Sequence, residues 1–131
     1  MGRDVILEEL NYLNELLNEC LRVMDEILRL RVGSIFWRLF FPAGQFMQQE
    51  SNAKSAAAIL VNIDVRLREM AEVLEERNHP LLQSIQQLLT IDLNDMADKL
   101  VELPQRAQYI MPQVEEIKIQ VEALISEMNR K

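Results

Sequence analysis

The chain has 131 residues, 49% of them hydrophobic, and carries 14 Lys and Arg against 21 Asp and Glu, for a formal net charge of −7. This length is typical of one domain with a full hydrophobic core, and the acidic balance argues against a nucleic-acid partner. Only three Gly and four Pro are present, and the abundant Leu, Glu, Gln and Met predict helices.

The first predicted helix covers residues 3–32. Apolar residues recur along it at alternating steps of four and three, the spacing of one helix face. They are Ile6, Leu10, Leu13, Leu17, Cys20, Met24 and Ile27. Two flanking rows are also apolar, so we expect this helix to contact at least two neighbours, as in a bundle.

The next stretch, residues 35–47, is named here the basic-aromatic segment. It holds five of the seven aromatic residues of the chain, and no acidic residue occurs between positions 27 and 49. We expect the chain to leave helical geometry before Pro42 and to turn back at Gly44. The predicted binding residues are Phe36, Trp37, Arg38, Phe40, Phe41, Phe46 and Met47.

The second predicted helix covers residues 52–77, capped by Ser51 or Asn52. Its apolar face is Ala56, Leu60, Ile63, Leu67, Met70 and Leu74. Its first turns are rich in alanine, which leaves room for bulky side chains such as those of the basic-aromatic segment.

The third predicted helix covers residues 80–102, after a turn at Asn78 and Pro80. Its apolar face is Ile85, Leu89, Leu93, Met96, Leu100 and Leu103, with a local irregularity expected at residues 90–92. The fourth covers residues 104–130, with apolar residues at Ala107, Ile110, Met111, Val114, Ile117, Val121, Leu124 and Met128. It either starts near Pro104 and kinks near Pro112, which we prefer, or starts at Pro112.

Together these segments predict an all-α protein, a single domain over residues 1–131. The expected fold is an antiparallel four-helix bundle with a long aromatic connection between the first and second helices. Cys20 is the only cysteine, so no internal disulfide forms, and a reducing, cytoplasmic location is expected. No apolar run reaches the roughly 18 residues of a membrane-spanning helix.

Residues that could carry catalysis or bind a metal are few. His79 is the only histidine, and we interpret it as an exposed turn residue rather than a metal ligand. Asp92, Asp95 and Asp98 are interpreted as a solvated face, with weak divalent-cation binding as the alternative. Cys20 falls on a core position and has no histidine near it in sequence. The chain is therefore predicted to be no enzyme and to need no cofactor or metal.

Three interpretations of the basic-aromatic segment stay open. It packs against the alanines of the second helix as an internal cap, it docks a protein partner, or it contacts a membrane surface. We predict a non-catalytic interaction module, an adaptor or assembly subunit, that binds a protein partner or a second copy of itself. The alternative is a bundle that binds a membrane surface or a small apolar ligand.

Overall fold

The computed structural model describes residues 2–32 and 42–130, and side chains for residues 5–29 and 50–130. Its described elements are all helical, as predicted, and include no strand. In chain order they are α1 (Gly2–Val32), α3 (Pro42–Glu76), α4 (Leu82–Leu89), α5 (Leu93–Glu102), the 3-10 helix η1 (Pro104–Arg106) and α6 (Ala107–Arg130). This set is compatible with a four-helix bundle whose third helix is broken into α4 and α5.

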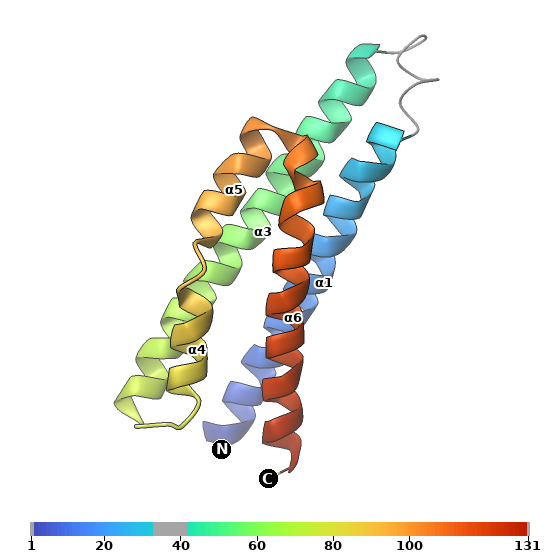
Figure 1. The fold of residues 1–131 in the computed structure, drawn as a ribbon. Helices are drawn as coiled ribbons and strands as arrows, with labels where there is room; N and C mark the ends of the chain where they lie inside the picture. The colour runs from blue at the N-terminus through green and yellow to red at the C-terminus, as the bar shows by residue number, and fades with distance from the viewer. Residues whose placement is uncertain (1, 33–41, 131) are drawn as a thin grey trace.

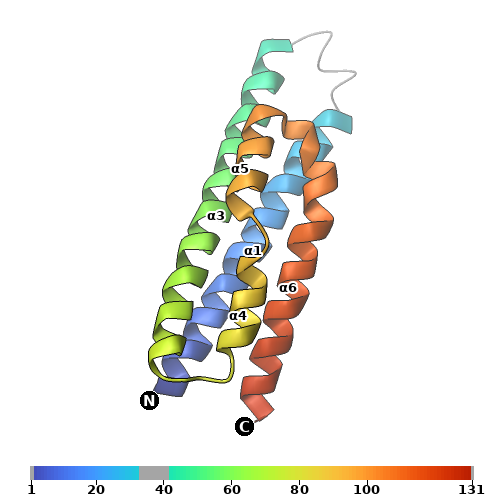
Figure 2. The same ribbon diagram turned by 60° about the vertical axis from the view of Figure 1, so that its left-hand side comes forward.

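The helices lie lengthwise beside one another, with both chain termini at the same end of the molecule (Figure 1). The closest packing joins α1 to α3, α3 to α5, and α1 to α6. The first turns of α3 project beyond the turn between α5 and α6, which is visible in both side views (Figures 1 and 2). The end of α1 and the start of α3 therefore both lie at the end opposite the termini.

The predicted core face of α1 is confirmed. Its seven residues are between 0% and 4% exposed, and those of α3 from Ala56 to Leu74 between 0% and 6%. The surface of α1 carries ion pairs between residues one helical turn apart. Arg22 pairs with both Glu19 and Glu26, and Arg29 pairs with Asp25. Exposed pairs of this kind contribute little to stability, so burial of the two wide apolar faces supplies most of the packing energy.

The start of α3 differs from the prediction. The helix begins at Pro42, not near Asn52, and its backbone is already helical at Gly44, where a turn was expected. Proline is tolerated in the first turn of a helix because its missing N–H would have no partner there, and its fixed φ is already helical. The predicted cap residues, Ser51 and Asn52, therefore lie inside the helix.

The turn after α3 has the expected cause. Asn78 adopts a left-handed conformation with φ of 50°, which asparagine tolerates better than most residues. The backbone N–H of Asn78 donates to the Glu75 carbonyl at 3.2 Å, and that of His79 donates to the Leu74 carbonyl at 2.9 Å. These two bonds close the end of α3 in the Schellman arrangement.

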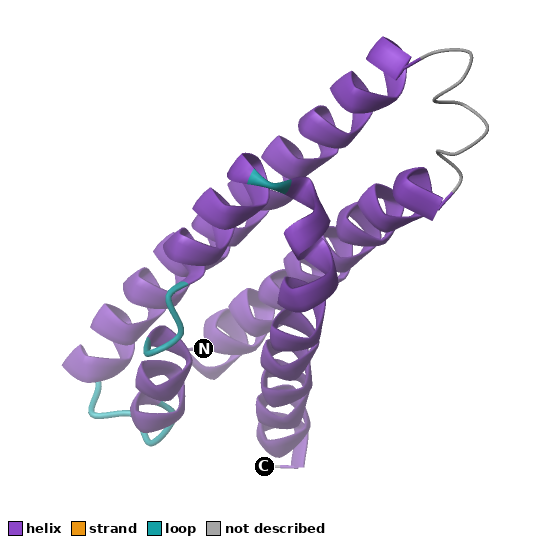
Figure 3. Cartoon of the chain, turned by 45° about the horizontal axis from the view of Figure 1, so that its top comes forward, coloured by secondary structure: helices purple, strands orange, loops and turns teal. Residues whose placement is uncertain are grey.

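The predicted third helix is interrupted at residues 90–92, where an irregularity was expected (Figure 3). The Thr90 hydroxyl donates to the Gln87 carbonyl at 2.6 Å, and the Asp92 carboxylate accepts from the Asp95 N–H at 3.0 Å. One side chain thus helps to end α4 while the other caps α5. The helix starts at Leu82, not Pro80.

The break changes which residues of this segment are buried. Leu88 is 1% exposed, whereas the predicted Leu89 is only half-buried, and the predicted Leu103 is 45% exposed. Leu103 is extended because it precedes Pro104. The chain then forms η1 and continues as α6 through Pro112. The fourth helical segment therefore starts at Pro104, not at Pro112. The predicted core face of α6 is buried except at Met111, which is half-buried.

Candidate functional site

The helix ends that flank the predicted binding residues, the end of α1 and the start of α3, lie at the end of the molecule opposite the chain termini (Figure 1). Phe36, Trp37, Arg38, Phe40 and Phe41 lie outside the described residues. Phe46 and Met47 belong to the first turns of α3, and only their backbone is described. The structure therefore places the frame of this site, the ends of α1 and α3, and leaves its binding residues as a prediction.

The junction of α5, η1 and α6 lies toward the end of the molecule where α3 begins (Figures 1 and 2). Leu103 and Tyr109 are among the exposed apolar residues near this junction. Leu103 is 45% exposed and Tyr109 is 69% exposed. Sequence periodicity assigned Leu103 to the core and gave no role to Tyr109. The signal that could have identified Leu103 is Pro104, because a residue before proline leaves the helix and loses its place on the helix face.

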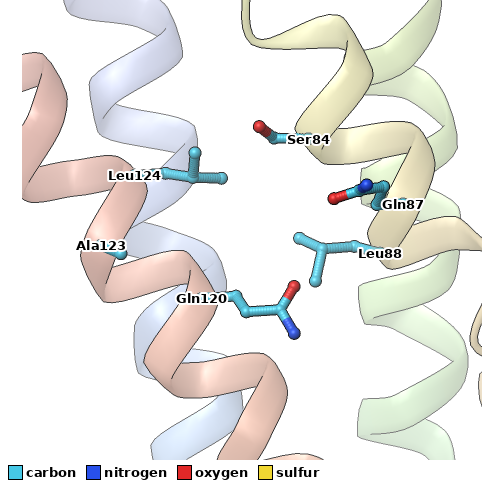
Figure 4. Close-up of a pocket in the computed structure, with 6 residues that line it drawn as sticks. All are labelled: Ser84, Gln87, Leu88, Gln120, Ala123 and Leu124. Carbon is cyan, nitrogen blue, oxygen red and sulfur yellow. The ribbon is translucent and has the colours of Figure 1, made fainter.

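The second candidate site is the α4–α6 groove, a shallow pocket of about 170 Å³ between these two helices (Figure 4). Leu88 of α4 and Leu124 of α6 form its buried floor, while Ser84, Gln87 and Gln120 point toward the space between the helices. Its lining residues carry no formal charge. The groove was not predicted, because it depends on how far apart two helices lie.

A second pocket of about 300 Å³ lies between α6 and the break after α4. It is lined by Ile91, Pro112, Gln113 and Glu116. Ile91 belongs to the break between α4 and α5, and the other three lining residues belong to α6. Neither pocket contains a cysteine, a histidine or a pair of carboxylates. Their lining offers apolar contact and hydrogen bonds from amide and hydroxyl groups, with a single carboxylate, Glu116, in the second pocket.

Asp64 is the one buried charged side chain among the described residues, at 4% exposure. Its Oδ2 atom accepts a hydrogen bond from Arg68 Nε at 2.9 Å and a second from Asn94 Nδ2 at 3.3 Å. The second bond joins α3 to α5 across 30 residues of sequence. Hydrogen bonding to Asp64 raises the pKa of Arg68. We interpret this cluster as structural, because the buried carboxylate accepts both hydrogen bonds from side chains of its own chain.

A second polar cluster joins α3 to α1. Arg66 Nη1 donates to Glu9 Oε1 at 2.9 Å, and the Arg66 guanidinium carbon lies 4.1 Å from the centre of the Tyr12 ring. The hydrogen bond with Glu9 is the main cause of the raised pKa of Arg66. An arginine that stacks on an aromatic ring and pairs with a carboxylate fixes the register of two helices.

Cys20 occupies the predicted core position. It is 0% exposed, with its Sγ atom 3.7 Å from Met24 Sδ and 3.8 Å from the Ala56 carbonyl oxygen. Burial raises the pKa of the Cys20 thiol from 9.0 to about 12. The small residues at the start of the α3 core face thus accommodate α1, which approaches closely at Cys20. Whether the basic-aromatic segment also packs there lies outside the described residues.

We predict that the Cys20 thiol of the native protein reacts with an alkylating reagent at pH 8 at least about 100-fold more slowly than in denaturant, because the thiolate is the reactive form and folding disfavours it. Mass-spectrometric labelling with and without urea measures the two alkylation rates. Equal rates would contradict the buried position.

Burial of the Cys20 thiol also makes the stability of the protein depend on pH. The thiol of the unfolded chain ionises at a lower pH than the buried thiol, so its contribution to the free energy of unfolding is complete below about pH 9 and is lost as the pH rises toward 12.

Two acidic residues at the start of α5 have structural roles, whereas Asp98 is exposed. Asp92 caps the helix, and Asp95 pairs with Lys99 at 2.8 Å, as the spacing predicted. His79 is half-buried rather than exposed, and its Nδ1 atom accepts a hydrogen bond from the Leu81 N–H at 3.1 Å. No group of three or more His, Cys, Asp or Glu side chains in the described part of the chain is arranged to hold a metal ion.

Comparisons with protein families, with curated proteins and with solved structures found no match to this chain. Among the described helices, none combines the length and the apolar character that crossing a membrane requires.

Proposed function

We propose that this protein is a non-catalytic interaction module, an adaptor or assembly subunit, that docks a protein partner through the basic-aromatic segment. Its frame is an antiparallel four-helix bundle, in which α4 and α5 together form the third helix. The packing of α1 with α3 and α6, and of α3 with α5, supports this arrangement.

The observation that carries the proposal is the position of the described part of the segment, residues 42–47. This part, from Pro42, forms the first turns of α3, which project beyond the turn between α5 and α6 (Figures 1 and 2). Tryptophan, phenylalanine, methionine and arginine are the residue types enriched at the centres of protein interfaces. A helix end that projects beyond the rest of the bundle, and whose sequence includes such residue types, suits the docking of a partner.

Trp37 is the only tryptophan in the chain, so its fluorescence tests the proposal directly. We expect a red-shifted emission that acrylamide quenches readily in the monomer, because a docking residue is accessible before its partner binds. A blue-shifted, shielded emission from a monomer of measured molar mass would instead indicate an internal cap, and would contradict the proposal.

A capture experiment then tests the partner. Trp37→Ala combined with Arg38→Glu is expected to lose at least about 30-fold in affinity for the captured protein, since hot-spot residues contribute about 2 kcal/mol or more. Ile119→Ala is the control, because Ile119 lies on α6 and is 61% exposed. Equal binding by both variants would reject the basic-aromatic segment as the docking surface.

The alternative, binding of a small apolar ligand, is favoured by one observation. The α4–α6 groove has a leucine floor and uncharged walls, in a protein whose surface is otherwise rich in charge. Native mass spectrometry of the purified protein would show a bound ligand as added mass, and Ala123→Trp, which fills the groove, would remove it.

A further inference from the structure

The outward face of α3 carries apolar side chains that the described helices leave open. Val61 is 42% exposed and Val65 is 44% exposed, and Ala58 is also exposed. They lie on the side of α3 away from Leu60 and Leu67, which are buried at 0% and 1%. Valine has a lower helix propensity than lysine, glutamate or glutamine. At an exposed position in the middle of a long helix, Val61 and Val65 therefore stabilise neither the helix nor the core.

These residues belong to a longer row, named here the outer seam. Its members are separated by alternating steps of four and three, so they share one face of the helix. They are Lys54, Ala58, Val61, Val65, Arg68 and Glu72. The centre of the outer seam is apolar, one end carries a lysine, and the other end carries an arginine followed by a glutamate.

The charges of the outer seam match those of a second copy in one direction only. When two α3 helices are antiparallel about a two-fold axis between Val61 and Val65, each Val61 faces Val65 of the second copy. Lys54 and Glu72 are each seven residues outward from the two valines, so each Lys54 then faces Glu72 of the second copy. In the parallel arrangement each residue faces itself, which places lysine against lysine and glutamate against glutamate.

The side chains at the ends of the outer seam are placed for this contact. Lys54 is 64% exposed, and its Nζ atom is 3.7 Å from Glu50 Oε1, a weak pair within the helix. Arg68 is held by Asp64 at 2.9 Å, so its guanidinium already has a partner in the same chain. Its aliphatic stem, opposite Ala58 of the second copy, supplies apolar contact without leaving a charge unpaired.

We propose that this protein forms a two-fold symmetric homodimer in which the outer seams of two antiparallel α3 helices pack against each other. The contact is isologous, so it closes at two subunits. It uses residues 54–72 and does not depend on the basic-aromatic segment or on the function proposed for it.

Charge reversal tests the pairing. Sedimentation equilibrium over a range of concentrations should give twice the chain mass for the wild type at high concentration. Lys54→Glu and Glu72→Lys should each move the monomer–dimer midpoint to a concentration about tenfold higher or more, because both symmetric contacts become repulsive. The double variant should return the midpoint to that of the wild type. Ile119→Asp is the control on another helix and should leave the midpoint unchanged.

Disulfide trapping tests the direction. In a Cys20→Ala background, a mixture of Val61→Cys and Val65→Cys chains should oxidise mainly to the mixed dimer, whereas a parallel dimer would give Val61→Cys homodimers. A wild type that is monomeric at every concentration would overturn the proposal. A double charge variant no better than either single variant, or a dimer that survives Val61→Asp, would overturn it as well. Circular dichroism of each variant checks that the helices are retained.

Discussion

Replacing Ile117 with alanine should lower the free energy of unfolding by about 2–5 kcal/mol. The side chain is 1% exposed and lies on the core face of α6, which packs against α1. Truncation removes buried methyl and methylene groups. It also leaves a cavity between α6 and α1, which the two helices cannot close by moving together. Urea denaturation followed by circular dichroism measures the change.

The matched control for this prediction is Ile119→Ala, the same substitution two residues along the same helix. Ile119 is 61% exposed, so the change should stay within about 0.5 kcal/mol. If both substitutions destabilise equally, the face of α6 that contacts α1 has been assigned wrongly. If neither does, α6 does not belong to the cooperative unit that unfolds in the experiment.

Replacing Asp64 with alanine should cost about 1.5–3 kcal/mol, the range for hydrogen bonds made by charged groups. The carboxylate is buried at 4% exposure and accepts bonds from Arg68 and Asn94. Without it, α5 loses a polar attachment to α3, and the buried space is left unfilled. Thermal unfolding of the variant and the wild type at one pH measures the loss.

Two further variants separate the causes. Asp98→Ala removes an exposed carboxylate from α5 and should change stability by less than about 0.5 kcal/mol. Combining Asp64→Ala with Asn94→Ala should cost less than the sum of the two single substitutions, because the bond they share is lost only once. Strict additivity would mean that the contact between Asp64 and Asn94 contributes nothing to stability.

The elements that were predicted correctly are those with a long, regular apolar period. In α1 and α6 every step of four or three carries an apolar residue, and these residues are buried. A helix that keeps one apolar face for many turns has only one orientation that removes this face from water. The same logic placed Cys20 in the core, and local backbone chemistry placed the turns at Asn78 and Pro104.

The start of α3 shows why local signals fail. Pro42 and Gly44 are found in turns, yet proline is equally suited to the first turn of a helix, and glycine costs a helix only about 1 kcal/mol. The break after Leu89 produced the other error. It shifts the buried position from Leu89 to Leu88, whereas Leu103 lies outside the core because it precedes Pro104. A prediction from periodicity assumes that the helix is unbroken. Here the Thr90 side chain helps to end α4 and the Asp92 side chain caps α5, so the helix is interrupted between them.

The candidate sites also differ in whether the sequence or only the fold makes them visible. The basic-aromatic segment was identified from composition alone, because aromatic and arginine residues concentrated in a connection need no fold to be visible. The outer seam of α3 was also present in the sequence as a row at steps of four and three, but only the exposure of Val61 and Val65 shows that the described helices do not cover it. The α4–α6 groove has no counterpart in the sequence.

The helical character of the protein, the buried faces of α1 and α6 and the position of two turns can be read from the amino-acid sequence, because they depend on interactions between residues a few positions apart. The contact of Asp64 with Asn94, the groove between α4 and α6 and the exposure of Val61 and Val65 appear only in the folded protein. Those features depend on the distances between helices far apart in the chain, and these distances follow from the packing of all the side chains together.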